Sequence, residues 1–448
     1  MKFRYLPMTE EDRQEMLSFL GLDSIEELFA EIPQDIRFEG ELNLPPALAE
    51  PTLVRHMHRL AKMNTSFDEA ACFLGAGAYD HYIPSVVGHM TSRSEFYTAY
   101  TPYQAEVSQG ELQAIFEFQT MISELTGMEV ANSSMYDGAT ALAEAAGVAY
   151  ATTRKRKILV SAGVHPEARA IISTQAKGLG LEVVTIPCQD GVTDLKVLDD
   201  KSDNETAAVL IQSPNFFGNI EDLKAIEPLA HRNKGLFVVS TNPMSLGVLT
   251  PPGKFGADIV VGEAQPLGIA VQFGGPHCGF FTTTKKLMRR IPGRIVGQTV
   301  DENGKRGFVL TLQAREQHIR REKATSNICS NQALNALGAA VYLSALGKAG
   351  FKEVSELNLQ KAHYAKQRLT QIPGVSACFT QPFFNEFALK LPLPVAQVNK
   401  ALLAQGMIGG YDLGRVDEEY TDCMLIAVTE LRTQEEIEAF ARVLEGLV

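Results

Sequence analysis

The stretch Gly256-Ala-Asp-Ile-Val-Val-Gly-Glu-Ala-Gln-Pro-Leu-Gly268 decides the fold class of this 448-residue chain. Its first part, Ala257 to Val261, is mostly apolar and β-branched and predicts a buried strand. A polar turn follows, and then the glycine-rich run Phe273-Gly-Gly-Pro-His-Cys-Gly279. Ligands of parallel sheets bind beyond the carboxyl ends of the strands, so this turn is a candidate site.

The same stretch resembles the cofactor-lysine segment of pyridoxal-phosphate enzymes of the aspartate-aminotransferase type. By this resemblance the lysine is expected at the end of the turn, about eight positions after Asp258, and Pro266 occupies that position. A proline side chain has no amine, so it cannot form the covalent link to the cofactor. We therefore expect no covalently bound cofactor here.

A second group that a pyridoxal site needs is also missing from the sequence. A carboxylate must lie against the pyridine nitrogen so that the ring acts as an electron sink. It is expected one strand before the lysine turn, yet the segment from Lys234 to Phe255 contains neither Asp nor Glu. With both groups absent, we predict a catalytically inactive pocket and no catalytic residue in this chain.

Short apolar, β-rich runs alternate with helical stretches between residues 66 and 325. Such alternation predicts an α/β domain whose mainly parallel sheet is covered by helices on both faces. The expected strands are Ile158–Val160, Val183–Ile186, Ala208–Gln212, Leu236–Val239 and Ile259–Val261, and the expected helices include Pro166–Lys177 and Asp222–Asn233.

The chain exceeds the ~250–300 residues beyond which one core usually splits, so further parts are expected. Residues 1–65 are interpreted as a helical arm without a core of its own, opened by capping-box patterns at Thr9 and Ser24. Residues 326–448 are interpreted as a smaller α+β domain. Its expected elements are helices Asn331–Leu346, Val354–Gln371 and Gln434–Leu447, and strands Phe387–Leu391 and Met424–Val428.

Two of the turns carry candidate cofactor-binding residues. Small and hydroxyl side chains in Ser133–Ala141 open a helix, where free amides can hold a phosphate, although an ordinary helix cap has the same pattern. His165 follows a strand and either stacks on a flat cofactor or is only a hydrogen-bonded histidine. The predicted vestigial cofactor residues are Tyr136, Asp137, Gly138, Ala139, Thr140 and His165.

Long motifs identify the family that the chain resembles, from Met8 to its end. That family is glycine decarboxylase, the pyridoxal-phosphate component of the glycine cleavage system, and the resemblance is to the half without the cofactor lysine. At this length the resemblance points to subunit 1 of the two-chain bacterial form. The motifs are Tyr97–Gln104 with Glu106–Gly110, Ser134–Leu142, Phe273–His277, Pro292–Val296 and Arg315–Ile328.

The resemblance implies an aspartate-aminotransferase-like fold (fold type I) and a role in glycine dehydrogenase (aminomethyl-transferring), with no activity for the chain alone. It implies that subunit 2 carries the lysine and the pyridoxal phosphate, in a heterotetramer of two of each. The complex would decarboxylate glycine and pass the aminomethyl group to the lipoyl arm of H-protein. Other interpretations are a free-standing pyridoxal enzyme with an unrecognised lysine, and a scaffold or regulatory subunit.

The resemblance also places the run from Tyr97 to Gly110 at the dimer seam, beside the partner's cofactor pocket. Packing against the arm is the alternative. Two basic clusters, Lys285–Arg294 and Arg315–Lys323, are either solvated helix faces or a docking surface. The residues expected to contact the partner's active site are Tyr97, Tyr100, Tyr103, Gln104 and Ser108.

Composition limits the classes of function. With 53 acidic and 41 basic residues the net charge is −12, which argues against a nucleic-acid binder with a broad basic face. Six scattered cysteines form neither a disulfide framework nor a zinc pattern, so we expect reduced thiols and no metal site. No targeting signal and no membrane span is recognised, and a cytoplasmic location is expected.

Overall fold

A computed structural model describes residues 8–448 except 39, 100–103, 273, 325 and 329–330. The chain divides into two units, Met1–Asn64 and Thr65–Val448. The second unit continues through the expected boundary at 325–326, so a separate C-terminal domain stays a prediction. Among the described residues, no helix is both long enough and apolar enough to cross a membrane.

The first unit consists of short helices with very little buried surface. Leu17 is the one buried side chain among its described residues, while Phe19 is 90% exposed. A unit with so little core gains little stability from burial within itself. Its elements are α1 (Glu10–Leu20), η1 (Ile25–Phe29), η2 (Gln34–Ile36) and α2 (Glu50–Ala61).

Of the two expected capping boxes in this unit, one forms. The Thr9 hydroxyl accepts a bond from the Asp12 amide, and the Asp12 carboxylate accepts one from the Thr9 amide at 2.7 Å. The second box was wrong, because the Ser24 side chain makes no capping bond and η1 is a 3₁₀ helix. The Ser24 hydroxyl instead donates to the Glu27 carboxylate, so the two side chains bind each other rather than backbone amides.

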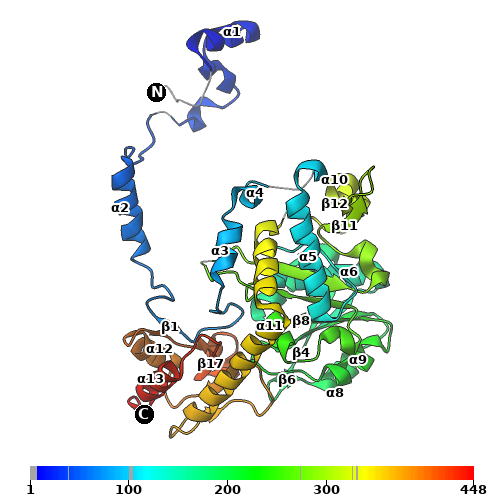
Figure 1. Ribbon diagram of the computed structural model, residues 1–448, viewed down its shortest axis with the longest axis vertical. Helices are drawn as coiled ribbons and strands as arrows, with labels where there is room; N and C mark the ends of the chain where they lie inside the picture. Colours follow the sequence, from blue (N-terminus) through cyan, green and yellow to red (C-terminus); the bar gives the residue numbers. More distant parts are fainter. Residues whose placement is uncertain (1–7, 39, 100–103, 273, 325, 329–330) are drawn as a thin grey trace. The chain divides into compact units, whose positions relative to one another are not determined.

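A seven-stranded sheet is the centre of the second unit (Figure 1). Five neighbouring strands run parallel, and they match the five strands expected from the sequence. One strand, β10, is antiparallel to both of its neighbours. The order is β2 (Val130–Ala131), β10 (Gly279–Thr283), β9 (Ile259–Glu263), β8 (Leu236–Thr241), β7 (Thr206–Gln212), β3 (Lys157–Ser161) and β4 (Glu182–Ile186).

Successive side chains of these strands enter two different cores, which explains why the strands are apolar throughout. In β7, Leu210 packs in a core with α6 (Gly138–Thr153) and α7 (Pro166–Leu179). The neighbouring Val209 packs in a second core with α8 (Leu195–Lys201) and α9 (Leu223–His231). Both faces of the sheet are therefore covered by helices, as predicted.

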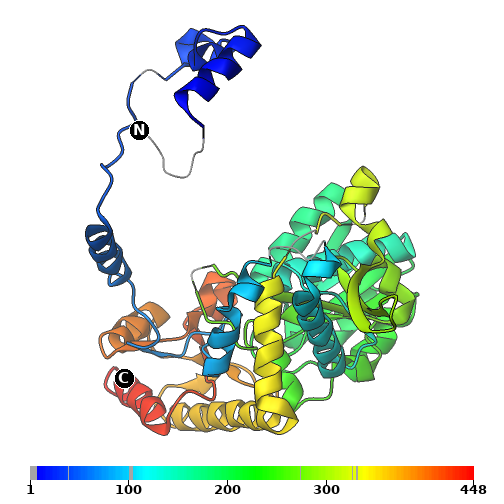
Figure 2. The same cartoon turned by 45° about the horizontal axis from the view of Figure 1, so that its top comes forward.

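The helix α11 (Ala333–Leu369) connects the sheet to the C-terminal part of the chain. It breaks at Gly347, where φ is 60°, a conformation that glycine adopts readily. Its first half packs on α5 (Gln109–Thr126) and its second half on β14 (Glu386–Lys390) and α13 (Gln434–Glu445). Figure 2 shows these halves meeting at an angle. The break explains why the sequence predicted two helices here.

A four-stranded antiparallel sheet forms the C-terminal part of the chain. It has the order β13 (Ser376–Ala377), β14 (Glu386–Lys390), β17 (Cys423–Ala427) and β16 (Tyr411–Asp412), with α12 (Val395–Leu403) and α13 (Gln434–Glu445). The other described α-helices and strands are α3 (Ser85–Thr91), α4 (Ser94–Tyr97), α10 (Gln317–Arg320), the pair β1 (Ala71–Cys72) and β15 (Met407–Ile408), and the hairpins β5 (Cys188–Gln189) with β6 (Val192–Thr193) and β11 (Ile295–Val300) with β12 (Arg306–Thr311).

Candidate functional site

A cavity of about 690 Å³ lies at the carboxyl ends of the parallel strands. It is lined by residues at or just after the ends of four neighbouring strands of the sheet. This is the edge at which open parallel sheets bind their ligands. The residues that represent the four strands are His165 (β3), Gln212 (β7), Asn242 (β8) and Glu263 (β9).

The cavity brings together most of the residues that were expected to hold a cofactor. Of the six, Thr140 is the one that does not line the cavity. The Thr140 amide instead donates to the Asp137 carboxylate at 2.7 Å, so Asp137 caps α6. The five that line it are Tyr136, Asp137, Gly138, Ala139 and His165.

Pro266 lines the same cavity, in the turn that follows β9. No lysine is found among the described residues of its lining. Asn242 follows the neighbouring strand β8, and its side-chain oxygen accepts a bond from the Met244 amide at 3.0 Å. The residues present therefore do not fit pyridoxal phosphate as a covalently held cofactor, since they offer no amine, and the position after β8 holds an amide instead of a carboxylate for the pyridine nitrogen.

Glu263, the last residue of β9, is a site residue that the sequence interpretation missed. One carboxylate oxygen accepts from the Gly138 amide at 3.0 Å. The other accepts from the amides of Gln265 at 3.0 Å and Cys278 at 2.9 Å. Burial raises the pKa of Glu263 to about 7, against the opposite effect of these three amides. An acidic residue at the end of a buried strand was the available signal.

His165 uses both ring nitrogens in bonds to the backbone. Nδ1 accepts from the Glu167 amide at 3.2 Å, which caps α7, and Nε2 therefore carries the proton that it donates to the Ala76 carbonyl at 2.9 Å. The ring also meets Phe216 edge to face, with centroids 5.0 Å apart. These contacts fit a hydrogen-bonded histidine at a strand end, and stacking on a cofactor stays a prediction.

A buried network fixes the loop that forms another wall of the cavity. The Tyr79 hydroxyl donates to the Glu386 carboxylate at 2.6 Å, and the Ala76 amide donates to its other oxygen at 2.7 Å. Gln265 bonds both the amide and the carbonyl of Tyr79 at 3.0 Å. Burial raises the pKa of Glu386 to about 7 and that of Tyr79 well above its usual value. The wall is therefore rigid rather than open to rearrangement.

The residues expected to face the partner are not part of this cavity. Tyr97 ends α4 and is 56% exposed, Gln104 is exposed, and Ser108 is partly buried at the start of α5. Tyr100 and Tyr103 lie outside the described residues. None of the three described side chains lines the cavity, and their contact with a partner stays a prediction.

Each of the two basic clusters contains both exposed and buried side chains. Lys285 lies on the surface, 3.9 Å from the Glu129 carboxylate. Arg315, by contrast, points inward and donates to the Ile291 carbonyl, and burial lowers its pKa. Arg294 of the first cluster is also buried, so neither cluster is wholly a solvated helix face.

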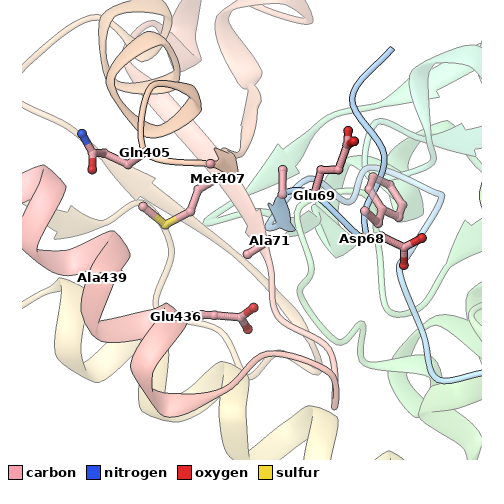
Figure 3. Close-up of a pocket in the computed structure, with 10 residues that line it drawn as sticks. Asp68, Glu69, Ala71, Gln405, Met407, Glu436 and Ala439 are labelled. Atoms are coloured by element: carbon pink, nitrogen blue, oxygen red, sulfur yellow. The ribbon is translucent and has the colours of Figure 1, made fainter. Parts of the chain in front are cut away.

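A second hollow of about 330 Å³ shares no lining residue with the first (Figure 3). Asp68, Glu69 and Glu436 contribute acidic side chains to it, and Gln405 and Met407 lie on another side. Its described lining residues include no Cys, Ser, Thr, Tyr, His, Lys or Arg. The described residues also contain no cluster of His, Cys, Asp and Glu side chains that could hold a metal ion.

Comparisons with known proteins bear on the whole chain. The model of the family "Glycine cleavage system P-protein" matches residues 3–444. A protein of Anoxybacillus flavithermus named probable glycine dehydrogenase (decarboxylating) subunit 1 is 63% identical over 99% of this chain and 98% of that protein. A protein of the same name from Halalkalibacterium halodurans is 64% identical over 99% of both chains.

Solved structures agree with the fold. A crystal structure of glycine decarboxylase (P-protein) of the glycine cleavage system, in inhibitor-bound form, has a TM-score of 0.90, 46% identity and full coverage of both chains. A sphingosine-1-phosphate lyase of Burkholderia pseudomallei, 14% identical, has a TM-score of 0.68 over 92% of this chain and 94% of that one. The predicted fold, that of fold type I pyridoxal-phosphate enzymes, is confirmed.

Proposed function

The chain belongs to the glycine cleavage system P-protein family, and we propose that it is the glycine decarboxylase subunit that holds no cofactor of its own. The observation that carries this proposal is Pro266, which lines the cavity at the position expected for the cofactor lysine. The name "subunit 1" of the relatives supports it, because that name implies a second subunit.

In this proposal the second subunit supplies the lysine and the pyridoxal phosphate. The complex, a heterotetramer of two of each subunit, removes the carboxyl group of glycine as CO2. It then passes the aminomethyl group to the lipoyl arm of H-protein. Pyridoxal phosphate supplies the electron sink for this chemistry in the partner, so the described residues of this chain bind and position but do not react.

Two surfaces of the chain are available for the partner. The first unit exposes apolar side chains such as Phe19 and Phe38, which gain stability when another surface covers them. The run from Tyr97 to Gly110 offers hydroxyl and amide groups that orient a ligand without ionising. We assign this run to the border of the partner's active site, and we assign the complex to the cytosol.

A free-standing pyridoxal enzyme is the competing function. It needs a lysine in the cavity, and the described lining residues include none. Lys254 lies in η5 (Pro252–Phe255), before β9 rather than after it. Lys285 follows β10 and binds Glu129 at the surface. Neither position brings an amine to the carboxyl ends of the strands.

The proposal is tested by expressing this chain alone, the second subunit alone and the two together. Glycine–bicarbonate exchange in the presence of H-protein is then measured at matched protein concentrations. We expect exchange only when both subunits are present. Full exchange by the second subunit alone would reduce this chain to a scaffold, and exchange by this chain alone would contradict the proposal.

A further inference from the structure

The helix α6 begins at the cavity, and two of its first three amide groups are bound by side chains. The Gly138 amide donates to Glu263 at 3.0 Å, and the Thr140 amide donates to the Asp137 carboxylate at 2.7 Å. The Ala141 amide donates to the Asp137 carbonyl. A helix start of this kind binds a phosphate through such amides, because they carry the positive end of the helix dipole. Here two carboxylates of the protein itself occupy the Gly138 and Thr140 amides, and the Ala139 amide has no partner among the described residues.

Glu263 is held in this position from three directions. Its oxygens accept bonds from the amides of Gly138, Gln265 and Cys278. Gly138 begins α6, Gln265 lies in the turn after β9, and Cys278 directly precedes β10. A Cβ atom at position 138 would lie 2.9 Å from the Glu263 backbone nitrogen, so glycine allows α6 to start this close to β9. To free the Gly138 amide, the carboxyl group must therefore leave a position that three hydrogen bonds hold.

The charge of the cavity also disfavours the binding of phosphate. Its lining includes the acidic residues Asp137, Glu167 and Glu263. Neither Lys nor Arg is found among the described lining residues. The two histidines of the lining do not offset this negative charge. His165 has both nitrogens in backbone bonds, and burial lowers the pKa of His277, which favours its neutral form. A phosphate dianion entering this cavity meets like charge without a counter-ion.

We propose that the Glu263 carboxyl group occupies the phosphate position of this cavity, so that the cavity rejects phosphate esters. This inference rests on the proposed function, because it explains how a subunit with the fold of a pyridoxal-phosphate enzyme leaves the cofactor to its partner. The absent lysine prevents a covalent link, but it does not prevent a phosphate ester from binding. Glu263 supplies a second barrier, which acts against the phosphate group and does not depend on the absent lysine.

Glu263 has an alternative role as a structural staple between α6 and β9, and binding measurements separate the two. The wild-type chain is compared with Glu263→Ala, which removes the carboxylate and frees three amides, and with Glu263→Gln, which keeps the shape and removes the charge. Glu167→Gln is the matched control. Glu167 lines the same cavity, is exposed and has the same carboxyl group, and no hydrogen bond joins this group to the start of α6 among the described residues.

The probes are inorganic phosphate and pyridoxal phosphate, added to each folded protein and followed by titration calorimetry and by the melting temperature. We expect no saturable binding to the wild type or to Glu167→Gln. Glu263→Ala should bind phosphate, with an affinity roughly tenfold or more above the wild type. Glu263→Gln should show a smaller gain, since its amide group faces the Gly138 N–H. Circular dichroism identifies a variant that fails to fold, and Glu263→Gln then provides the comparison.

Two results would overturn the inference. One is phosphate binding to the wild type as tight as to the variants. The other is a folded Glu263→Ala or Glu263→Gln that melts earlier but binds no phosphate, which is the behaviour of a staple. Neither result touches the proposed function, because that function fails separately, if this chain performs exchange without its partner.

Discussion

Asn242 and Pro266 line one cavity, and they follow the adjacent parallel strands β8 and β9. A pyridoxal-phosphate enzyme of this fold needs a carboxylate and a lysine after these two strands. Here the first position holds an amide whose oxygen caps the helix η4 (Pro243–Gly247), and the second holds a buried ring without a polar group. The cavity therefore lies where such a site is expected, and these two positions offer neither of the groups that carry its chemistry.

Restoring one of these groups should not restore activity. Pro266→Lys returns an amine to the cavity, but Asn242 still offers no negative charge to the pyridine nitrogen, and both groups act together. We expect no glycine–bicarbonate exchange above background from this variant without its partner. Turnover by Pro266→Lys alone would mean that another acidic group completes the site.

The run from Tyr97 to Gly110 should affect activity through the partner. A lost positioning hydrogen bond typically costs about 0.5–1.5 kcal/mol, so Gln104→Ala or Tyr100→Phe should lower exchange by the complex several-fold. Assembly should be unchanged in sedimentation at the assay concentration. Gln371→Ala, at an exposed position outside this run, is the control and should have no effect. Full activity in Tyr97→Phe, Tyr100→Phe, Tyr103→Phe and Gln104→Ala would show that the run only packs.

His231 makes stability depend on pH in the alkaline range. Its ring bonds Asp258 at 2.8 Å and also Glu227, and these acceptors, Asp258 foremost, raise the pKa of His231 to about 9. A raised histidine pKa stabilises the fold fully below the unfolded value near 6.5, and this contribution is lost as the pH rises through 9. His231→Asn should therefore cost about 1 kcal/mol near pH 6, after allowance for solvent screening, and much less near pH 10.

The measurement is urea unfolding of both proteins across this pH range. His89→Asn, a change of an exposed histidine, is the control and should leave the curve unchanged. An equal loss of stability at pH 6 and pH 10 would assign the effect of His231 to packing instead.

The buried pair of Tyr79 and Glu386 makes stability depend on pH in the acidic range. Burial raises the pKa of Glu386 from 4.5 to about 7, so its contribution is complete below 4.5 and is lost as the pH rises through 7. Glu386→Gln carries no charge at any pH, so the wild type should lose stability relative to this variant between pH 4.5 and pH 7. Denaturation curves at both values test this, and a difference that stays constant with pH would contradict it.

Removing the hydroxyl of Tyr79 should destabilise the protein through the same pair. In Tyr79→Phe the Glu386 carboxylate loses its 2.6 Å donor inside the protein, which should cost about 1–3 kcal/mol. Tyr364→Phe is a useful comparison, because the Tyr364 hydroxyl also donates to a carboxylate at 2.6 Å but does so near the surface. Calorimetric melting should show the larger loss for Tyr79→Phe, and equal losses would contradict a penalty from burial.

The sequence was most informative where the signal is local. The strands β3 and β7 were predicted because their runs are apolar throughout, and the break of α11 at Gly347 appeared as the end of a predicted helix at Leu346. The Thr9 cap was also predictable, since its two partners are three residues apart. At Ser24 the same spacing failed, because a hydroxyl–carboxylate bond competes with the cap.

The cavity was predicted only in part, because its contacts connect distant residues. Pro266, His165 and the start of α6 were identified from the turns in which they lie. Glu263 was not identified, because its hydrogen bond to the Gly138 amide connects residues 125 positions apart in the chain. Tyr79 and Glu386 are separated by 307 positions, and nothing near either residue indicates the other. Long-range polar pairs of this kind need the fold before they can be recognised.

The most direct test of the central claim is the location of the cofactor in the assembled complex. The complex of this chain with its second subunit is reduced with borohydride, which fixes pyridoxal phosphate to the lysine that holds it. The two chains are then separated, digested and mapped by mass spectrometry. We predict one labelled lysine in the second subunit and none in this chain, because Pro266 provides no amine. A stoichiometrically labelled lysine anywhere in this chain would contradict the account.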